Sequence, residues 1–240
     1  MSGRGRWARG PSVCRLLLVL WAASASAGGA EGALRGAFAD LLGGPPVLRL
    51  EAVPDLQEGM YARISLYAQR ARIAGLLVDH LWVRLRGVTL DPEGLMQGRV
   101  RVLAQRDAAL HALVTLRSLE EFLARSPDVE EVHLEYHRGL LAGRGVLRMR
   151  GMPVRVGMVV GFEALETPAV FVRVHALRVN GVPLPAPVVE EFERRINPLL
   201  DMAQWPVSFR IRSVRITPTH VVLTTLRRPT DPCDFCQMLP

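Results

Sequence analysis

Long runs of alternating apolar and polar residues constrain the fold of this chain more than any other feature. The clearest run places Leu81, Val83 and Leu85 on one face of an extended strand. Its other face carries polar residues, among them Arg84 and Arg86. A strand with one apolar and one solvent-exposed face is typical of an antiparallel sheet that is covered on one side. Similar runs recur along most of the chain, and the glycines inside them indicate β-bulges and strong curvature.

Three segments have the helical spacing of apolar residues instead. The first runs from Ala33 to Leu42 and ends at two glycines and two prolines. The second begins at Ser118, where Ser118 and Glu121 match a capping box. The third covers residues 188–200. With eight or nine strands grouped around these helices, the predicted class is α+β, a long, strongly curved antiparallel β-sheet wrapped around an amphipathic helix.

The third helix is the centre of the predicted fold. It follows a strand over residues 170–179, an Asn180-Gly181 turn and three prolines that hold its approach extended. Asn197-Pro198 is expected to kink or end it. Its apolar stripe consists of Val188, Val189, Phe192, Ile196, Leu199 and Leu200. Such a stripe either fills the concave side of a curved sheet or leaves an apolar groove there, and periodicity does not decide between the two.

Two further patterns make local predictions. The segment from Gly139 to Gly145 is rich in glycine and indicates a turn region. After the third helix, Val207, Phe209 and Ile211 alternate with polar residues and predict another strand. Both segments belong to the single α+β domain that we assign to residues 60–228.

The remaining parts of the chain differ in composition. Residues 1–27 carry arginines, a short apolar run and an A-x-A site that ends at Ala27, as in a cleaved export signal. An uncleaved signal anchor is the alternative. Residues 28–59 form a lead-in helix and linker, and residues 229–240 form a C-terminal tail. We therefore expect a protein exported across the cytoplasmic membrane that is soluble or peripheral in the cell envelope after cleavage.

Net charge argues against one class of partner. The formal charge is +7, but the first 27 residues contribute four arginines and no acid, which leaves 26 basic and 23 acidic residues. A mature chain at +3 is too weakly basic to indicate nucleic-acid binding. Every basic residue is arginine, which suits phosphate groups but also follows from the base composition of a GC-rich genome.

The sequence contains no recognisable catalytic or cofactor motif. A phosphate-binding loop, a nucleophile elbow and a zinc-protease helix are all absent. His133 and His137 share a strand face with two glutamates, but a solvated polar face explains them more simply than a metal site does. We expect no enzymatic activity, no cofactor and no bound metal.

Two cysteines remain after the expected cleavage, Cys233 and Cys236, and both lie in the C-terminal tail. Export permits a disulfide between them. A thioredoxin-like pair would stand at the start of a helix, and a zinc site would need two more ligands nearby. The prediction is a small local disulfide or two surface thiols.

Three motifs carry a resemblance to a known family. They are Val83–Asp91 (VRLRGVTLD), Leu119–Leu123 (LEEFL) and Leu177–Pro185 (LRVNGVPLP), in this order within residues 61–226. The chain thereby resembles the LmeA-type phospholipid-binding family of bacterial envelopes, which is similar to the tubular lipid-binding proteins. In those proteins a strongly curved sheet wraps a long helix and encloses acyl chains. The family offers no catalytic constellation, and the Cys-x-x-Cys of the tail is not one of its features.

The resemblance implies a non-catalytic envelope protein that binds phospholipid or a related lipid in an apolar groove. The expected groove wall consists of Val188, Val189, Phe192, Ile196, Leu199, Leu200, Leu81, Val83 and Leu85. The candidates for binding the headgroup are Arg84, Arg86, Arg99 and Arg101. An anionic membrane surface is a second expected partner. The alternative is an envelope scaffold or interaction protein with a filled core, no lipid cargo and a protein partner that the sequence does not identify.

Overall fold

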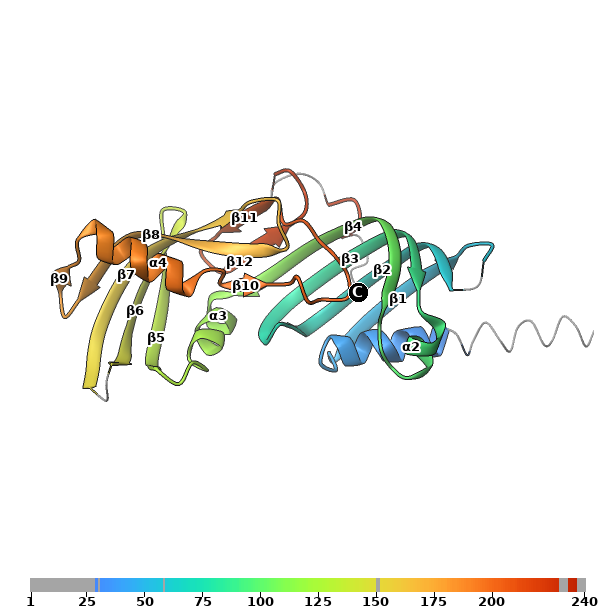
Figure 1. Ribbon diagram of the computed structural model, residues 1–240, viewed down its shortest axis with the longest axis horizontal. Coiled ribbons are helices and arrows are strands. Elements are labelled where there is room, and N and C mark those ends of the chain that lie inside the picture. The colour runs from blue at the N-terminus through green and yellow to red at the C-terminus, as the bar shows by residue number, and fades with distance from the viewer. Residues whose placement is uncertain (1–28, 30, 58, 150–151, 229–232, 237–240) are drawn as a thin grey trace, which may run out of the picture.

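The computed structural model describes residues 29, 31–57, 59–149, 152–228 and 233–236, so the expected export signal lies outside the described residues. The described part is elongated, with one sheet toward each end (Figure 1). Each of these sheets has six strands, neighbouring strands pair antiparallel, and neither sheet closes into a barrel. The predicted class, rich in β-structure with few helices, is therefore right, but the strands form two sheets where one was predicted.

Sheet A combines N-terminal and C-terminal strands in the order β1-β2-β3-β4-β12-β11. Its strands are β1 (Val47–Pro54), β2 (Met60–Ile73), β3 (Leu76–Leu90), β4 (Val102–Thr115), β11 (Ser213–Ile216) and β12 (His220–Thr224). The short helix α2 (Pro92–Met96) connects β3 to β4. The pairing register shifts between Thr89 and Leu90, and such irregularities bend a sheet, as the phase shifts in the sequence predict.

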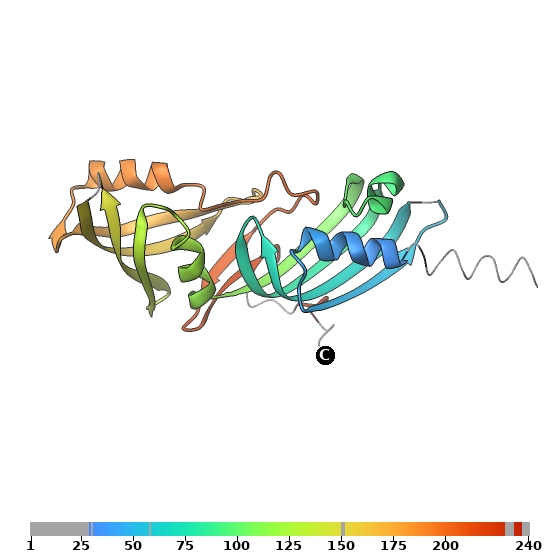
Figure 2. The same ribbon diagram turned by 90° about the horizontal axis from the view of Figure 1, so that it is seen from below.

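The inner face of sheet A is filled by side chains. The first predicted helix spans residues 31–41 and lies across this face (Figure 2). Its Leu34 and Phe38 are buried in the same core as Leu81 and Leu85 of β3. The helix thus packs onto sheet A and β1 is an edge strand of that sheet, whereas the sequence places both in a lead-in.

The segment 202–212 completes this core. Val207, Phe209 and Ile211 are at most 1% exposed, which agrees with their alternation. The strand predicted from this run begins only at Ser213 (β11), and the prediction is wrong for residues 207–211, because within the described residues this segment has no strand partner. It crosses the core instead of joining an edge, and the N–H of Ile211 donates to the carbonyl of Thr167 at 3.0 Å.

Sheet B has the strand order β10-β8-β7-β6-β5, and β9 pairs with β8 beside this path. Its strands are β5 (Val129–His137), β6 (Leu140–Met149), β7 (Met152–Ala164), β8 (Ala169–Val179), β9 (Val182–Pro183) and β10 (Leu200–Asp201). The two-residue strands β9 and β10 pair with opposite ends of β8 and leave its central part without a strand neighbour on that side.

Strand β6 begins inside the segment for which the glycines predict a turn. The turn is confirmed at Gly139, but its predicted extension to Gly145 is wrong because Gly143 and Gly145 permit close packing within the sheet. A Cβ atom on Gly145 would lie 2.5 Å from the carbonyl oxygen of Glu131 on β5. A Cβ atom on Gly143 would lie 3.1 Å from the Met158 side chain on β7.

Helix α3 (Leu116–Leu123) follows β4 directly. Its N-cap is Thr115, whose hydroxyl accepts the N–H of Ser118 at 3.1 Å. The predicted capping box at Ser118 is therefore displaced by about one turn. Asp79 fixes the earlier start, since its carboxylate accepts the N–H of Thr115 at 2.8 Å and the hydroxyl of Ser118 at 3.1 Å.

Helix α4 (Ala186–Ile196) ends before Asn197-Pro198, so Leu199 and Leu200 lie beyond the helix that was predicted to include them. Pro198 lacks the N–H that a continuing helix needs. Leu200 then begins β10. Helix α4 lies along sheet B (Figure 1), whereas the helix of residues 31–41 covers sheet A. The expected wrapping of one sheet around a single helix is not confirmed.

Two side chains attach α4 to the central part of β8. The carboxylate of Glu193 accepts the N–H of Val174 at 2.8 Å. The amide of Asn197 bonds both the N–H and the carbonyl of Val172. An open strand edge is a template for pairing with other chains, and here side chains cover it.

Candidate functional site

An apolar cavity of about 380 Å³ lies between sheet B, α3 and α4. Helix α3 contributes Leu119 and Leu123. Phe192 and Ile196 of α4, and Leu199 just after it, form a second side. The sheet contributes Val132, Leu134, Leu141, Leu147, Val156, Met158, Val160, Phe162 and Val172. Three separate elements thus enclose one hydrophobic space.

The strand register explains why this wall is apolar. Leu134, Gly143 and Met158 lie directly opposite one another on β5, β6 and β7. The next row along these strands contains His133 and Arg144, which are also opposite one another. Because successive side chains point to opposite faces, the first row faces the cavity and the second faces away.

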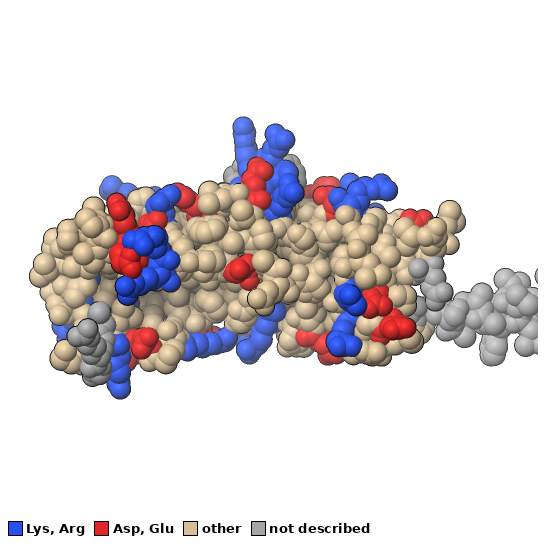
Figure 3. Space-filling view, viewed as in Figure 1, with Lys and Arg blue, Asp and Glu red and all other residues tan. Residues whose placement is uncertain are grey.

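The outward face of α4 is charged, which leaves its apolar stripe for the interior. Glu191 forms ion pairs with Arg194 and with Arg195 on this face. Figure 3 shows the charged side chains gathered at the position of α4. Helix α4 is therefore amphipathic, with Phe192 and Ile196 toward the cavity.

A smaller apolar gap of about 30 Å³ adjoins the cavity. The two spaces share Leu119, Phe162 and Leu199, and the gap is also lined by Leu200 and by Val221 of β12. The apolar space therefore reaches toward sheet A, whose own inner face is filled. Side chains fill the inner face of sheet A, whereas the inner face of sheet B borders the cavity.

Polar residues line part of the cavity wall. Ser126 and Asp128 come from the α3–β5 connection. Glu131 of β5 and Arg144 of β6 also border the cavity, but their side chains are on the opposite face of the sheet, toward the outer hollow. A polar border on an apolar cavity is the arrangement that an amphipathic ligand needs, because its polar end must keep hydrogen-bonding partners.

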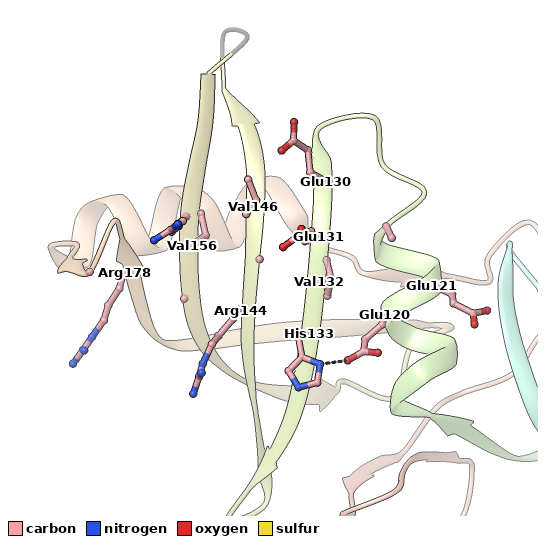
Figure 4. A pocket seen from close by; sticks show the side chains of 15 residues that line it. Glu120, Glu121, Glu130, Glu131, Val132, His133, Arg144, Val146, Val156 and Arg178 are labelled. Carbon is pink, nitrogen blue, oxygen red and sulfur yellow. Dashed lines mark ion pairs between the residues drawn. The ribbon is translucent and has the colours of Figure 1, made fainter.

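A broader open hollow of about 830 Å³ lies beside these strands (Figure 4). Arg144 and Arg178 are placed on either side of Gly157, where a Cβ atom would meet nothing within 4 Å. His133 lies 3.3 Å from the carboxylate of Glu120 on α3. Within the described residues neither Arg144 nor Arg178 has an acidic partner, so both remain available to an anion. Arg144 borders both spaces, with its side chain on the side of the hollow.

The predicted groove wall is divided between different places. Phe192, Ile196 and Leu199 line the cavity, and Leu200 lines the adjoining gap. Val189 packs half-buried against the core, whereas Val188 is 45% exposed. The β3 residues Leu81, Val83 and Leu85 are buried in the core of sheet A.

The four predicted headgroup arginines all lie on or beside sheet A. Arg84 forms an ion pair with Asp234 at 2.7 Å, and Arg86 is exposed on the same strand. Arg99 bonds Gln97 near α2, and Arg101 lies 3.7 Å from Asp91. Among the described residues that line the cavity, none of these four is present.

Sequence reasoning did not select α3 or the inner face of sheet B as part of the site. The alternation of Val132 and Leu134 does indicate a buried face, and Leu119 and Leu123 do form an apolar helix side. Neither pattern shows that the two surfaces face each other across a space.

Comparison with known proteins identifies one family. The model of the LmeA-like phospholipid-binding family matches residues 21–225 of the chain. No curated protein and no solved structure matches the sequence significantly. None of the helices in the described part of the chain combines the length and the apolar character needed to cross a bilayer.

Proposed function

Because the chain belongs to the LmeA-like phospholipid-binding family, we propose that it binds a phospholipid or related envelope lipid with an acyl chain in the cavity behind sheet B. The observation that carries this proposal is the cavity of about 380 Å³ whose apolar wall is built by α3, α4 and sheet B. Each methylene group removed from water contributes about 0.8 kcal/mol. About ten such groups would contribute about 8 kcal/mol before the cost of ordering the chain, which is the scale of micromolar affinity.

The headgroup is proposed to lie where polar residues border the cavity. Arg144 belongs to that border, and Arg178 lies beyond Gly157 on the same face of sheet B. A guanidinium group binds phosphate oxygens through two parallel hydrogen bonds. This position suits a headgroup better than the four arginines of sheet A do, because Arg144 lies where the cavity and the outer hollow adjoin, whereas those four arginines line neither space.

The protein is proposed to act outside the cytoplasm, at an anionic membrane surface of the cell envelope. The arginine-rich start, the apolar run and the A-x-A site ending at Ala27 support export with cleavage. The role is binding without a chemical reaction, in keeping with the family and with a wall made largely of aliphatic side chains.

The test is to express the full chain with its N-terminal segment, purify the exported protein and examine it by native mass spectrometry and lipid extraction. The expected result is a phospholipid that remains bound in the gas phase and is released by organic solvent. Exported, folded protein that carries no lipid and takes up none from vesicles would contradict the proposal and favour the scaffold alternative.

A further inference from the structure

A row of aromatic rings lies on the outer face of sheet A, away from its core and from the cavity. Tyr67, Trp82 and His111 are directly opposite one another on β2, β3 and β4. The ring centroids of Tyr67 and Trp82 are 5.3 Å apart, and those of Trp82 and His111 are 5.7 Å apart. Strand pairing therefore holds the His111 imidazole in a fixed place.

Residues 233–236 of the C-terminal tail fold onto this row. Phe235 is 7% exposed and packs with Tyr67, Trp82 and Ala109. Arg84 holds the same segment from the side, with its guanidinium 4.9 Å from the Phe235 ring centroid and 2.7 Å from the Asp234 carboxylate. The segment is thus attached by an aromatic side chain and by an ion pair.

This attachment brings three potential metal ligands together. The sulfur atoms of Cys233 and Cys236 and a ring nitrogen of His111 all lie within 4.8 Å of one another. The two sulfurs form a disulfide in this structure. The Nδ1 atom of His111 is buried and has no hydrogen-bond partner among the described residues. A buried polar atom without a partner is uncommon and requires an explanation.

We propose that the reduced Cys233–Cys236 pair and His111 form a binding site for a thiophilic metal cation, Zn²⁺ or Cu⁺. Two thiolates and one imidazole are a soft donor set, which selects these cations over Mg²⁺ or Ca²⁺. Three protein ligands leave a fourth tetrahedral position open on Zn²⁺. The proposal rests on the aromatic row and the tail, and it is independent of lipid binding.

The Cys233–Cys236 disulfide must be reduced before its sulfurs can bind a metal. A dithiol reductant transfers two electrons and two protons to the disulfide, which yields two thiols while the reductant becomes a disulfide itself. Each thiol then releases its proton as its sulfur binds the metal. Zn–S bonds of about 2.3 Å and Zn–N bonds of about 2.0 Å require the two sulfurs to separate from bonding distance to about 3.8 Å and the His111 nitrogen and the sulfurs to come within about 3.5 Å of each other. Rotation of the freed cysteine side chains supplies this movement.

Residues 233–236 are already docked on sheet A before a metal binds, because this docking does not depend on the sulfur–sulfur bond. Phe235 and Asp234 lie between the cysteines in the sequence, and their contacts with Tyr67, Trp82 and Arg84 of sheet A involve neither sulfur. Sequence analysis predicted no metal here because no suitable histidine lies near the cysteines. His111 is distant in the sequence, and only the docking of the tail onto β4 brings it close.

The test uses the mature full chain, reduced with a dithiol and freed of reductant without oxygen. Co²⁺ serves as a coloured substitute for Zn²⁺, and Cu⁺ is offered in competition with a chromophoric chelator. We expect one equivalent of metal, with a thiolate-to-cobalt absorption band in the first arm. The oxidised protein is expected to bind neither ion at this site.

Three variants decide the assignment. His111→Gln is expected to weaken binding at least tenfold, and the double change Cys233→Ser and Cys236→Ser is expected to abolish it. His80→Gln is the matched control, since His80 stacks on Trp82 beside the aromatic row but is not among the three ligands. The proposal is overturned if reduced, folded protein takes up neither metal, or if His111→Gln binds as tightly as His80→Gln. Circular dichroism of each variant verifies folding, and the cysteine variant tests the site independently if His111→Gln does not fold.

Discussion

The side-chain amide of Asn197 accepts the N–H of Val172 at 2.7 Å and donates to the carbonyl of the same residue at 2.8 Å. One side chain therefore replaces a neighbouring strand at this point of β8. It also fixes the end of α4, whose Phe192 and Ile196 line the cavity. The geometry of the proposed lipid site thus depends on a residue that does not line it.

Replacing Asn197 with alanine should destabilise the protein and loosen the cavity wall. Two hydrogen bonds are lost, and each contributes about 0.5–1.5 kcal/mol, so the free energy of unfolding should fall by about 1–3 kcal/mol. Urea denaturation measures this change, and lipid retention should fall with it. Glu191→Ala on the exposed face of α4 is the control and should leave the urea midpoint nearly unchanged. Equal effects of the two substitutions would show that the amide does not hold α4.

Filling the cavity should displace lipid without disturbing the rest of sheet B. Val132 lines the cavity, whereas Val146 lines only the outer hollow and is opposite the neighbouring residue Glu131. Val132→Phe should therefore reduce the lipid-bound fraction severalfold in native mass spectra. Val146→Phe adds the same volume to the other face and should leave that fraction unchanged. Lipid loss in both variants, or in neither, would argue against the cavity as the binding site.

Asp79 should stabilise α3 from the neighbouring sheet. Its carboxylate accepts hydrogen bonds from the N–H of Thr115 and the hydroxyl of Ser118 at the start of the helix. Asp79→Ala should lower the free energy of unfolding by about 1–3 kcal/mol, the usual effect of losing a helix cap and its hydrogen bonds. Asp107→Ala, an exposed change on β4, is the comparison in the same urea experiment. A midpoint for Asp79→Ala that matches the comparison variant would refute this role.

The stability of the oxidised, metal-free protein should decrease in mild acid because of His111. Burial lowers the pKa of this imidazole below its ordinary value of 6.5. The unfolded chain therefore binds the proton more readily than the folded protein does. The stability that the neutral His111 imidazole contributes is complete above about pH 6.5, and it is lost as the pH falls from that value through the lower pKa of the folded protein. Urea midpoints between pH 8 and pH 5 should fall more steeply for wild type than for His111→Gln, and parallel curves would exclude the effect.

Export makes a prediction about the mature N-terminus. Cleavage after Ala27 should give a protein that begins with Gly28. Replacing Ala25 and Ala27 with bulky residues should block cleavage, because the site requires small side chains. N-terminal sequencing of the exported protein checks both outcomes. A mature chain that still begins at the first residue would establish the uncleaved anchor instead.

Alternation in the sequence predicted which faces of the strands are buried, as Leu81, Val83 and Leu85 show, because period two depends only on the side-chain geometry of each strand. It did not predict which strands share a sheet. Val207, Phe209 and Ile211 alternate as a strand does, yet they cross a core without a strand partner among the described residues. Pairing depends on contacts between distant segments, and periodicity carries no information about them.

The candidate site was predictable in part for the same reason. Proline at position 198 correctly marked the end of α4, and the apolar stripe correctly included Phe192 and Ile196. The opposing wall from α3 and sheet B required the strand register. The approach of His111 to the two cysteines likewise follows from tail docking, which no local pattern encodes.

The order of the strands has a consequence for how this protein is made. Strands β4 and β12 are neighbours in sheet A, yet all of sheet B, α3 and α4 are synthesised between them. While residues 116–219 emerge, the edge of β4 that β12 will cover has no partner from its own chain. Exposed edges invite mispairing, and pairing between distant segments folds slowly. Sheet B, α3 and α4 are therefore synthesised before sheet A can be completed. The nascent chain exposes the free edge of β4 until β11 and β12 have been made.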